Sequence, residues 1–142
     1  MLQRLLSEEI AQWWPLLHDG IVKSLPPTAS EEESSLSNIM LALMQGRMQI
    51  WIEEEEGKVR GFVVTAVTIE EFSKTKNLLI FSLYSNGTLS AEKWKEGLVT
   101  IKEYAKKSGC NKIVGFTIKP LVESIIIKLG GRAINTLVEF EL

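Results

Sequence analysis

The sequence predicts one α+β domain in which a central mixed β-sheet is flanked by helices, in the order helix, helix, strand, strand, strand, helix, strand, helix, strand. Apolar residues recur at helical spacing up to Gly46 and then at every second position, which indicates a change from helix to strand. Later in the chain a strand-helix-strand pattern predicts a parallel pair joined by a right-handed crossover. The 142 residues suit a single domain, residues 1–142.

The first helix is expected from Ser7 onward, because apolar residues recur on one face between Ile10 and Leu17. Ser7 is the expected N-cap. Pro15 lacks a backbone donor and crowds the preceding turn, so we expect a kink or a break near Trp14.

The second helix is expected to open at Ser30-Glu31-Glu32-Glu33 and to end at Gly46. Its apolar positions between Leu36 and Met44 fall on one face. Both helices therefore carry an apolar face that must be covered by the sheet.

Three strands should follow. Met48 to Ile52 alternates apolar and other residues, and Gly57-Lys58 marks a hairpin turn. Val59 to Val67 is rich in β-branched residues and should return antiparallel to the first strand. Asn77 to Tyr84 is almost wholly apolar, which is typical of a central strand.

The segment from Ser90 to Ser108 has the clearest helical period of the chain, and Gly109 should end that helix. A short buried strand is expected from Lys112 to Thr117, parallel to the strand before the helix. Pro120 should then begin a short helix, and Ala133 to Leu142 should form the last strand.

Composition narrows the class of protein. A net charge of -2, a pI near 5.5 and a mean hydropathy of +0.08 describe a folded soluble chain without the basic excess that nucleic acid requires. The single cysteine, Cys110, excludes an intrachain disulfide and fits a reducing compartment, so a cytoplasmic location is expected. No apolar run is long enough for a membrane helix, and none resembles a signal peptide.

At this point the chain resembles the GNAT (Gcn5-related N-acetyltransferase) fold, over about Ser7 to Leu142, in its order of elements. Three phrases look most like small GNAT-like proteins of phages and prophages: Gly46-Arg47-Met48-Gln49-Ile50-Trp51, Gly61-Phe62-Val63-Val64-Thr65 and Gly109-Cys110-Asn111-Lys112-Ile113. Against that family the chain looks trimmed at both ends, with no clear first strand and no room for the last strand that many members carry.

The resemblance implies an acetyl-CoA site after the third strand, where family members carry Gln/Arg-x-x-Gly-x-Gly/Ala at the start of a helix. Backbone N-H groups there hold a pyrophosphate. The corresponding stretch, Tyr84 to Lys93, has one glycine and no leading Arg or Gln. Asn86-Gly87 is typical of a turn, Ser90 of an N-cap, and Glu92 would repel a phosphate. The candidate cofactor-binding residues are Leu83, Ser85, Gly87, Thr88, Leu89, Ser90 and Ala91.

The resemblance also implies a tyrosine on the following helix as the acid that protonates the departing thiolate. The segment from Pro120 to Leu129 contains no tyrosine, and its only titratable residues are Glu123 and Lys128. Tyr84 is therefore the catalytic candidate in place of that helix tyrosine. A packing role for Tyr84 is the alternative.

Other conspicuous residues have structural explanations. The acidic run Glu53-Glu54-Glu55-Glu56 predicts a solvated hairpin rather than a metal site, because successive strand side chains point to opposite faces. His18 is isolated, and Cys110 suits a buried inert thiol. Trp14 and Trp51 mark either a partner surface or, for Trp51, a second layer against the sheet.

Two functions are compatible with these observations. The first is a non-catalytic GNAT-like module of phage or prophage origin with a degenerate acetyl-CoA site and no bound cofactor. Such a module would bind a virion or host protein, either in the host cytoplasm or in the virion. The alternative is an acetyl-CoA-dependent N-acetyltransferase that acts on an amine by direct transfer, with backbone N-H groups of Thr88 to Glu92 holding the pyrophosphate. A homo-oligomer through the apolar third strand and exposed tryptophans is compatible with the first.

Overall fold

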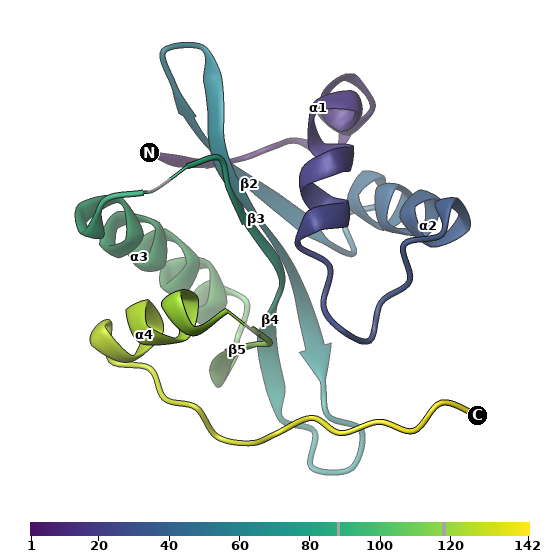
Figure 1. Cartoon of the computed structure of the whole chain (residues 1–142), viewed down its shortest axis with the longest axis vertical. Helices are drawn as coiled ribbons and strands as arrows, with labels where there is room; N and C mark the ends of the chain where they lie inside the picture. Colours follow the sequence, from purple (N-terminus) through teal and green to yellow (C-terminus); the bar gives the residue numbers. More distant parts are fainter. Residues whose placement is uncertain (88, 118) are drawn as a thin grey trace.

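A computed structural model describes residues 1–87, 89–117 and 119–142, and its centre is a five-stranded sheet in the order β1-β2-β3-β4-β5 (Figure 1). The strands are β1 (Leu2–Arg4), β2 (Gln49–Glu55), β3 (Lys58–Ile69), β4 (Lys76–Ser85) and β5 (Lys112–Gly115). Neighbouring strands are antiparallel except β4 and β5, which are parallel, as the strand-helix-strand pattern predicts.

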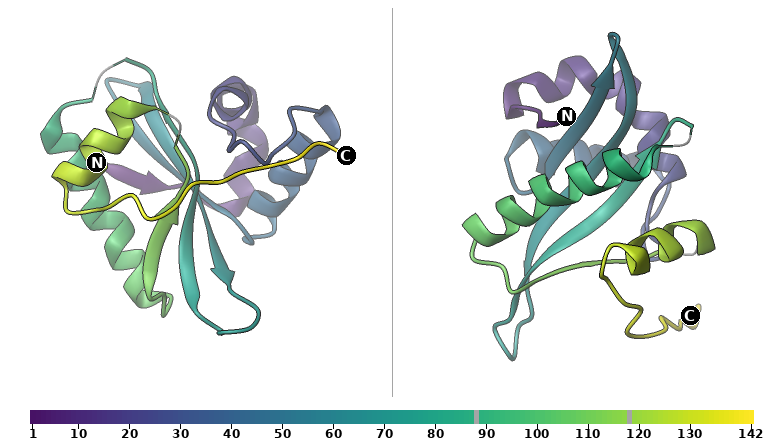
Figure 2. Two further views of the ribbon diagram at one scale, coloured as in Figure 1. Left: turned by 60° about the horizontal axis from the view of Figure 1, so that its bottom comes forward. Right: turned by 90° about the vertical axis from the view of Figure 1, so that its left-hand side faces the viewer.

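Helices cover both faces of the sheet. They are α1 (Ile10–Lys23), α2 (Glu33–Met44), α3 (Ala91–Lys107) and α4 (Pro120–Lys128), with a 3₁₀ turn, η1 (Ser7–Glu9), before α1. Helices α1 and α2 lie on one side, and α3 and α4 on the other (Figures 1 and 2). The α+β class with a mixed sheet is confirmed.

Each side of the sheet has its own apolar core. The first core lies between the sheet and the pair α1 and α2, and its centre includes Leu17, Ile21 and Val64, each 0% exposed. The second lies between the sheet and α3, around Leu78 and Ile101. Burial of such side chains is the main term that stabilises the layers.

The start of the first helix differs from the prediction. Leu6, not Ser7, is the N-cap of η1, and the Glu9 carboxylate accepts a hydrogen bond from the Leu6 backbone N-H at 2.8 Å. Helix α1 then continues through Pro15 instead of breaking near Trp14. The loss of one backbone hydrogen bond at Pro15 is tolerated because buried residues on both sides of it hold the helix on the sheet.

The two ends of the chain also differ. A first strand exists: β1 pairs antiparallel with β2 and buries Leu2, but three residues are too short to give a strand period. The predicted last strand, Ala133 to Leu142, is not a strand, because it pairs with no described neighbour. It passes across the strand direction, from the α4 side toward the α1 and α2 side (Figures 1 and 2).

Trp51 belongs to the second core and not to an exposed surface. Its ring is 7% exposed, lies 5.0 Å from the Tyr104 ring in an edge arrangement, and its Nε1-H donates to the Thr65 hydroxyl at 3.0 Å. Trp14 is half-buried against the first core and beside His18. No helix in the described ranges is long and apolar enough to cross a membrane.

Candidate active site

The strands β4 and β5 separate part of the way along β4. Their pairing ends where Ile80 meets Gly115, but β4 continues for five more residues, from Phe81 to Ser85. On its other side β4 stays paired with β3 as far as Ser85. In the described part of the chain, the edge of β4 that faces β5 is therefore open from Phe81 to Ser85.

A β-bulge lies at the point of separation. Thr65 pairs with Ile80 and Val64 with Ser82, so Phe81 is the extra residue. A bulge bends a strand and increases its twist. Phe81 thus turns the end of β4 away from β5 and opens the space between the two strands.

The junction between β4 and α3 is a tight turn. Gly87 has φ +95, in the left-handed region that favours glycine, and no atom lies within 4 Å of where its Cβ would be. The Asn86 N-H donates to the Arg60 carbonyl at 2.8 Å, and the Ser85 hydroxyl donates to the Gly87 carbonyl. The turn chemistry of Asn86-Gly87 is confirmed, whereas Thr88 lies outside the described residues.

Helix α3 begins with the predicted cap. The Ser90 hydroxyl accepts a hydrogen bond from the Lys93 N-H at 3.3 Å. The Ala91 and Glu92 N-H groups belong to the first turn, where helix geometry gives them no partner within the helix. Leu89 is half-buried beside them, and Glu92 is exposed. The helix start therefore offers backbone donors to an anion, next to one repelling carboxylate.

The only basic residue in that first turn is engaged elsewhere. Lys93 Nζ lies 3.0 Å from a carboxylate oxygen of Glu53, and this hydrogen bond and charge raise the pKa of Lys93. Glu53 is 7% exposed and also accepts a hydrogen bond from the N-terminal amine at 2.8 Å. Burial acts to raise the pKa of Glu53, but these two partners together bring it below its usual value.

Glu53 corrects one prediction. The acidic run was expected to be solvated throughout, but Glu53 is buried because it lies on the same face of β2 as Trp51, and α3 covers that face at both residues. The run does end in a tight turn, with positive φ at Glu56 and Gly57. No signal in the run itself separates Glu53 from the exposed residues that follow it.

The predicted site residues of β4 point to both faces of the sheet. Leu83 and Ser85 pair with Val63 and Gly61, on the α3 side, where Val63 packs against the second core. Tyr84 pairs with Phe62 of the first core and therefore faces α1. The structure thus brings Leu83, Ser85 and the start of α3 together, and sets Tyr84 on the opposite face of the same open strand end.

Packing holds the Tyr84 ring in place. It lies 5.2 Å from the Phe62 ring, and both rings approach Gly20 of α1 so closely that a Cβ there would lie 2.6 Å from Phe62 and 3.0 Å from Tyr84. Gly20 is the residue that lets these two aromatic rings reach the helix. This contact favours a packing role for the ring and leaves a role for the hydroxyl to experiment.

The remaining conspicuous residues do not form a chemical centre. His18 lies 3.4 Å from Asp19 and 3.3 Å from Glu33, bridging α1 and α2 near the surface. Cys110 is half-buried against the second core. Within residues 1–87, 89–117 and 119–142, no three His, Cys, Asp or Glu side chains gather where they could share a metal ion.

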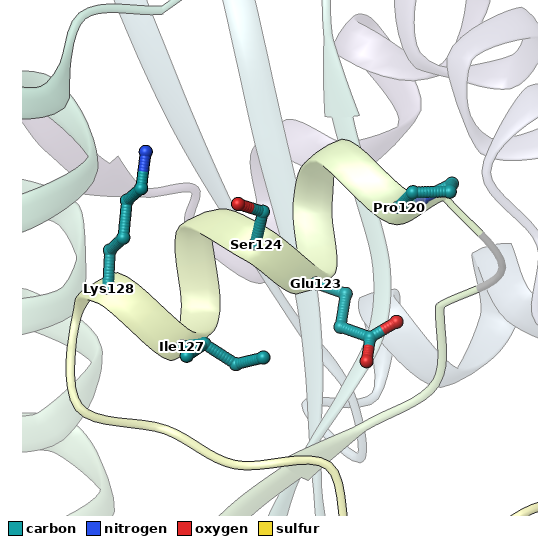
Figure 3. Close-up of a pocket in the computed structure, with 5 residues that line it drawn as sticks. All are labelled: Pro120, Glu123, Ser124, Ile127 and Lys128. Atoms are coloured by element: carbon teal, nitrogen blue, oxygen red, sulfur yellow. The ribbon is translucent and has the colours of Figure 1, made fainter.

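Neither of two hollows on the surface of the described residues coincides with the open strand end. One, of about 380 Å³, follows a single face of α4 and is lined by Pro120, Glu123, Ser124, Ile127 and Lys128 (Figure 3). Since all five come from one helix, no second element closes it. The other, of about 340 Å³, lies at the far edge of the sheet between β1, η1, α1 and β2.

Comparison with known proteins identifies the fold. No protein-family model and no curated protein matches the sequence. Among solved structures, a predicted acetyltransferase with acetyl-CoA from Clostridium acetobutylicum is 14% identical, with a TM-score of 0.73 and coverage of 99% of this chain and 95% of that one. A ribosomal-protein-alanine N-acetyltransferase of Brucella melitensis biovar Abortus 2308 is 12% identical, with a TM-score of 0.68 and coverage of 100% and 99%.

A third similar structure is an aminoglycoside acetyltransferase from an uncultured soil metagenomic sample, in complex with sisomicin. It is 14% identical, with a TM-score of 0.70 and coverage of 100% of this chain and 94% of that one. At identities this low, structural similarity establishes the arrangement of the chain, and its chemistry has to be argued from the residues of the site. The chain has the fold of the GNAT acetyltransferases.

Proposed function

We propose that this protein is an N-acetyltransferase that takes the acetyl group from acetyl-CoA and transfers it directly to an amine. The observation that carries the proposal is the open edge of β4 from Phe81 to Ser85, which leads into the start of α3. The similarity to acetyltransferases solved with acetyl-CoA or CoA supports it as an analogy of fold.

The open edge suits the amide-containing arm of coenzyme A. Unpaired N-H and C=O groups of a strand edge can pair with an extended ligand as they would with another strand. Leu83 and Ser85 would flank that arm on the α3 side. The pyrophosphate would lie at Gly87, Thr88 and the N-H groups of Ala91 and Glu92, held by backbone donors and the helix dipole. Leu89 and Ser90 complete this binding segment.

The chemistry would be one acyl transfer. The amine nitrogen bonds to the acetyl carbon, the thioester C-S bond breaks, and the proton released by the amine is balanced by one gained by the CoA sulfur. Tyr84 is the proposed proton donor, since it is the titratable residue on the open strand end and α4 has no tyrosine. A cytoplasmic location is part of the proposal.

This choice reverses the preference drawn from the sequence. The non-catalytic module rested on a poor glycine loop and a missing helix tyrosine, and both features concern side chains. The open edge and the helix start present backbone groups, which bind an anion or an amide whatever the side chains are. Phage origin, a virion location and a virion or host protein partner have no support in the fold, and we do not carry them into the proposal.

The proposed acetyl-CoA site, called the donor site below, can be tested by a substitution of Glu92, the exposed carboxylate at the start of α3. Glu92→Gln removes a negative charge beside the proposed pyrophosphate, so the Kd for CoA should fall about threefold. Glu103→Gln is the matched control, since Glu103 is an exposed residue near the other end of α3. Isothermal titration with CoA measures both. Equal affinities in the two variants, or no binding by the unaltered protein, would contradict the donor site.

The role of Tyr84 is tested by Tyr84→Phe, which keeps the ring between Phe62 and Gly20 and removes only the hydroxyl. If that hydroxyl donates the proton, kcat should fall about 100-fold or more with little change in the KM for acetyl-CoA. Tyr104→Phe is the control, because Tyr104 packs on Trp51 in the second core. Thiol release from acetyl-CoA is followed with an aminoglycoside, a peptide with N-terminal alanine and a polyamine. A Tyr84→Phe variant as active as the control assigns Tyr84 to packing alone.

A further inference from the structure

One buried hydroxyl at the open strand end has no partner. Ser82 of β4 is 3% exposed, and its Oγ atom forms no hydrogen bond with any described residue. Such an atom costs free energy, and most buried polar groups in folded proteins are therefore paired. Thr65 of β3 shows the ordinary case, since its buried hydroxyl bonds to two side chains. Ser82 is therefore a candidate to bind a ligand or a water molecule.

Ser82 lies on the face of β4 that is turned toward α1. It pairs with Val64 of the first core, and the next residue on the same face is Tyr84, whose ring approaches Gly20 of α1. The bulge brings Phe81 to this face as well, because Phe81 also packs against the first core. The unpartnered hydroxyl thus lies between the extra residue of the bulge and the proposed proton donor.

The direction of the proposed coenzyme A arm places the reacting thioester near Ser82. With the pyrophosphate at Gly87 and the start of α3, the arm follows the open edge from Ser85 toward Phe81. The open edge ends at the bulge, because the preceding residue, Ile80, pairs with β5. The acetyl group at the far end of the arm would therefore lie at the level of Phe81 and Ser82.

The two faces of the sheet differ in what they offer an incoming amine. An arm that adds to the edge as a strand would hold its thioester carbonyl near the plane of the sheet, and a nucleophile attacks a carbonyl from above or below its plane. On the α3 side the position is flanked by Ile80 and Leu83, whose side chains carry no polar atom. On the α1 side it is flanked by the unpartnered hydroxyl of Ser82. The α1 side is therefore the side on which an amine finds a hydrogen-bond partner.

We propose that Ser82 binds the acceptor amine. Its Oγ atom accepts a hydrogen bond from an amine N-H and directs the nitrogen lone pair toward the acetyl carbon. The inference rests on the proposed acetyl transfer and adds the residue that holds the second substrate. Ser82 keeps its own proton, so the bonds that form and break are those of the transfer described above.

The burial of Ser82 restricts the amine that it binds. The Oγ atom is closed to water in the free protein, so the amine would reach it only when a neighbouring side chain such as the half-buried Phe81 moves. A single hydroxyl beside an apolar core does not compensate the burial of an ammonium group. The amine would therefore bind in its uncharged form, as a primary or secondary amine.

Two substitutions that each remove one buried hydroxyl form a matched pair. Ser82→Ala should raise the KM for the amine about tenfold, because one hydrogen bond is lost, with less change in kcat and none in the Kd for CoA. Since the hydroxyl has no partner in the free protein, Ser82→Ala should leave the midpoint of urea unfolding unchanged or raise it. Thr65→Val should do the opposite, lowering the midpoint and leaving the KM for the amine unchanged. Rates are measured with sisomicin, a peptide with N-terminal alanine and spermidine.

Each outcome decides the inference. A raised KM for the amine without a lowered midpoint supports Ser82 as the residue that binds the amine. Transfer by Ser82→Ala with an unchanged KM, or with a change in kcat alone, overturns the inference and leaves acetyl transfer standing. A midpoint lowered as in Thr65→Val also overturns it, because the hydroxyl then has a protein or water partner in the free chain. If the unaltered protein acetylates none of the three amines, the proposed function itself fails and the inference fails with it.

Discussion

The chain up to Ala105 and the chain after it are packed very differently. Every buried side chain of the described residues lies at or before Ala105, and two apolar cores lie on the two faces of the sheet. After it come a four-residue strand, a helix without a buried residue and an exposed C-terminal tail, residues 133–142. The open end of β4 lies at the boundary between the two regions. One wall of the proposed site, β4, therefore has packed cores behind it, whereas the other wall, β5 with α4, buries no side chain.

The largest expected effect contrasts a core residue with a tail residue. Leu17 is 0% exposed, so Leu17→Ala should lower the free energy of unfolding by about 2 to 5 kcal/mol through lost burial and the cavity left behind. Val138 is 78% exposed, and Val138→Ala should change it by less than about 0.5 kcal/mol in dilute, monomeric protein. Urea unfolding measures both. Similar losses in the two variants would remove the contrast between the regions.

An intermediate effect on the free energy of unfolding is expected from the buried hydrogen bonds of the second core. The Thr65 hydroxyl accepts from Trp51 Nε1 at 3.0 Å and donates to the Gln49 side chain at 2.9 Å. Thr65→Val keeps the shape but leaves both partners unsatisfied, which should cost about 1 to 3 kcal/mol. Thr68→Val on the same strand is the control, because its hydroxyl makes only a 3.4 Å contact to a carbonyl. An equal cost in the two variants would show that the network contributes nothing.

The smallest effect is a pH dependence from Glu53. Its pKa is lowered in the folded state from an ordinary value of 4.5, so its ion pairs stabilise the fold above that value and are lost as the pH falls through the folded-state pKa. The unaltered protein should therefore lose its stability advantage over Glu53→Gln as the pH is lowered below about 4.5. Glu54→Gln, at an exposed position of the same strand, is the control. A gap between the unaltered protein and Glu53→Gln that stays constant with pH would contradict the ion pairs.

The well-packed region up to Ala105 is the part of the fold that the sequence predicts best. The period of Ser90 to Ser108 and the cap at Ser90 give α3 almost residue by residue, since a helix is set by local contacts. Strands β2, β3 and β4 follow from alternation and β-branched runs. The tail shows the limit of such patterns: alternation indicates that a segment can form a strand, but it does not indicate whether an edge is available.

The site is less predictable because its geometry depends on pairing. The sequence predicts the turn at Asn86-Gly87 and the helix start, but the bulge at Phe81 arises from a shift of register against β3 that no local pattern marks. The burial of Glu53 cannot be predicted from the sequence for a related reason, because its partners are the N-terminal amine and Lys93 of α3. Trp51 fits a surface or a second layer equally well until Tyr104 and Thr65 are placed beside it.

The most direct test of the proposed function is a titration with CoA followed by backbone amide NMR shifts. Bound CoA should shift the amides of Phe81 to Ser85 and those of Ala91 and Glu92, because these groups line the open edge and the helix start. Amides of β1 and η1, at the far edge of the sheet, should stay unchanged. A CoA titration that shifts no amide of β4 or α3, or that shifts only the far edge, would contradict the acetyl-CoA site and with it the proposed activity.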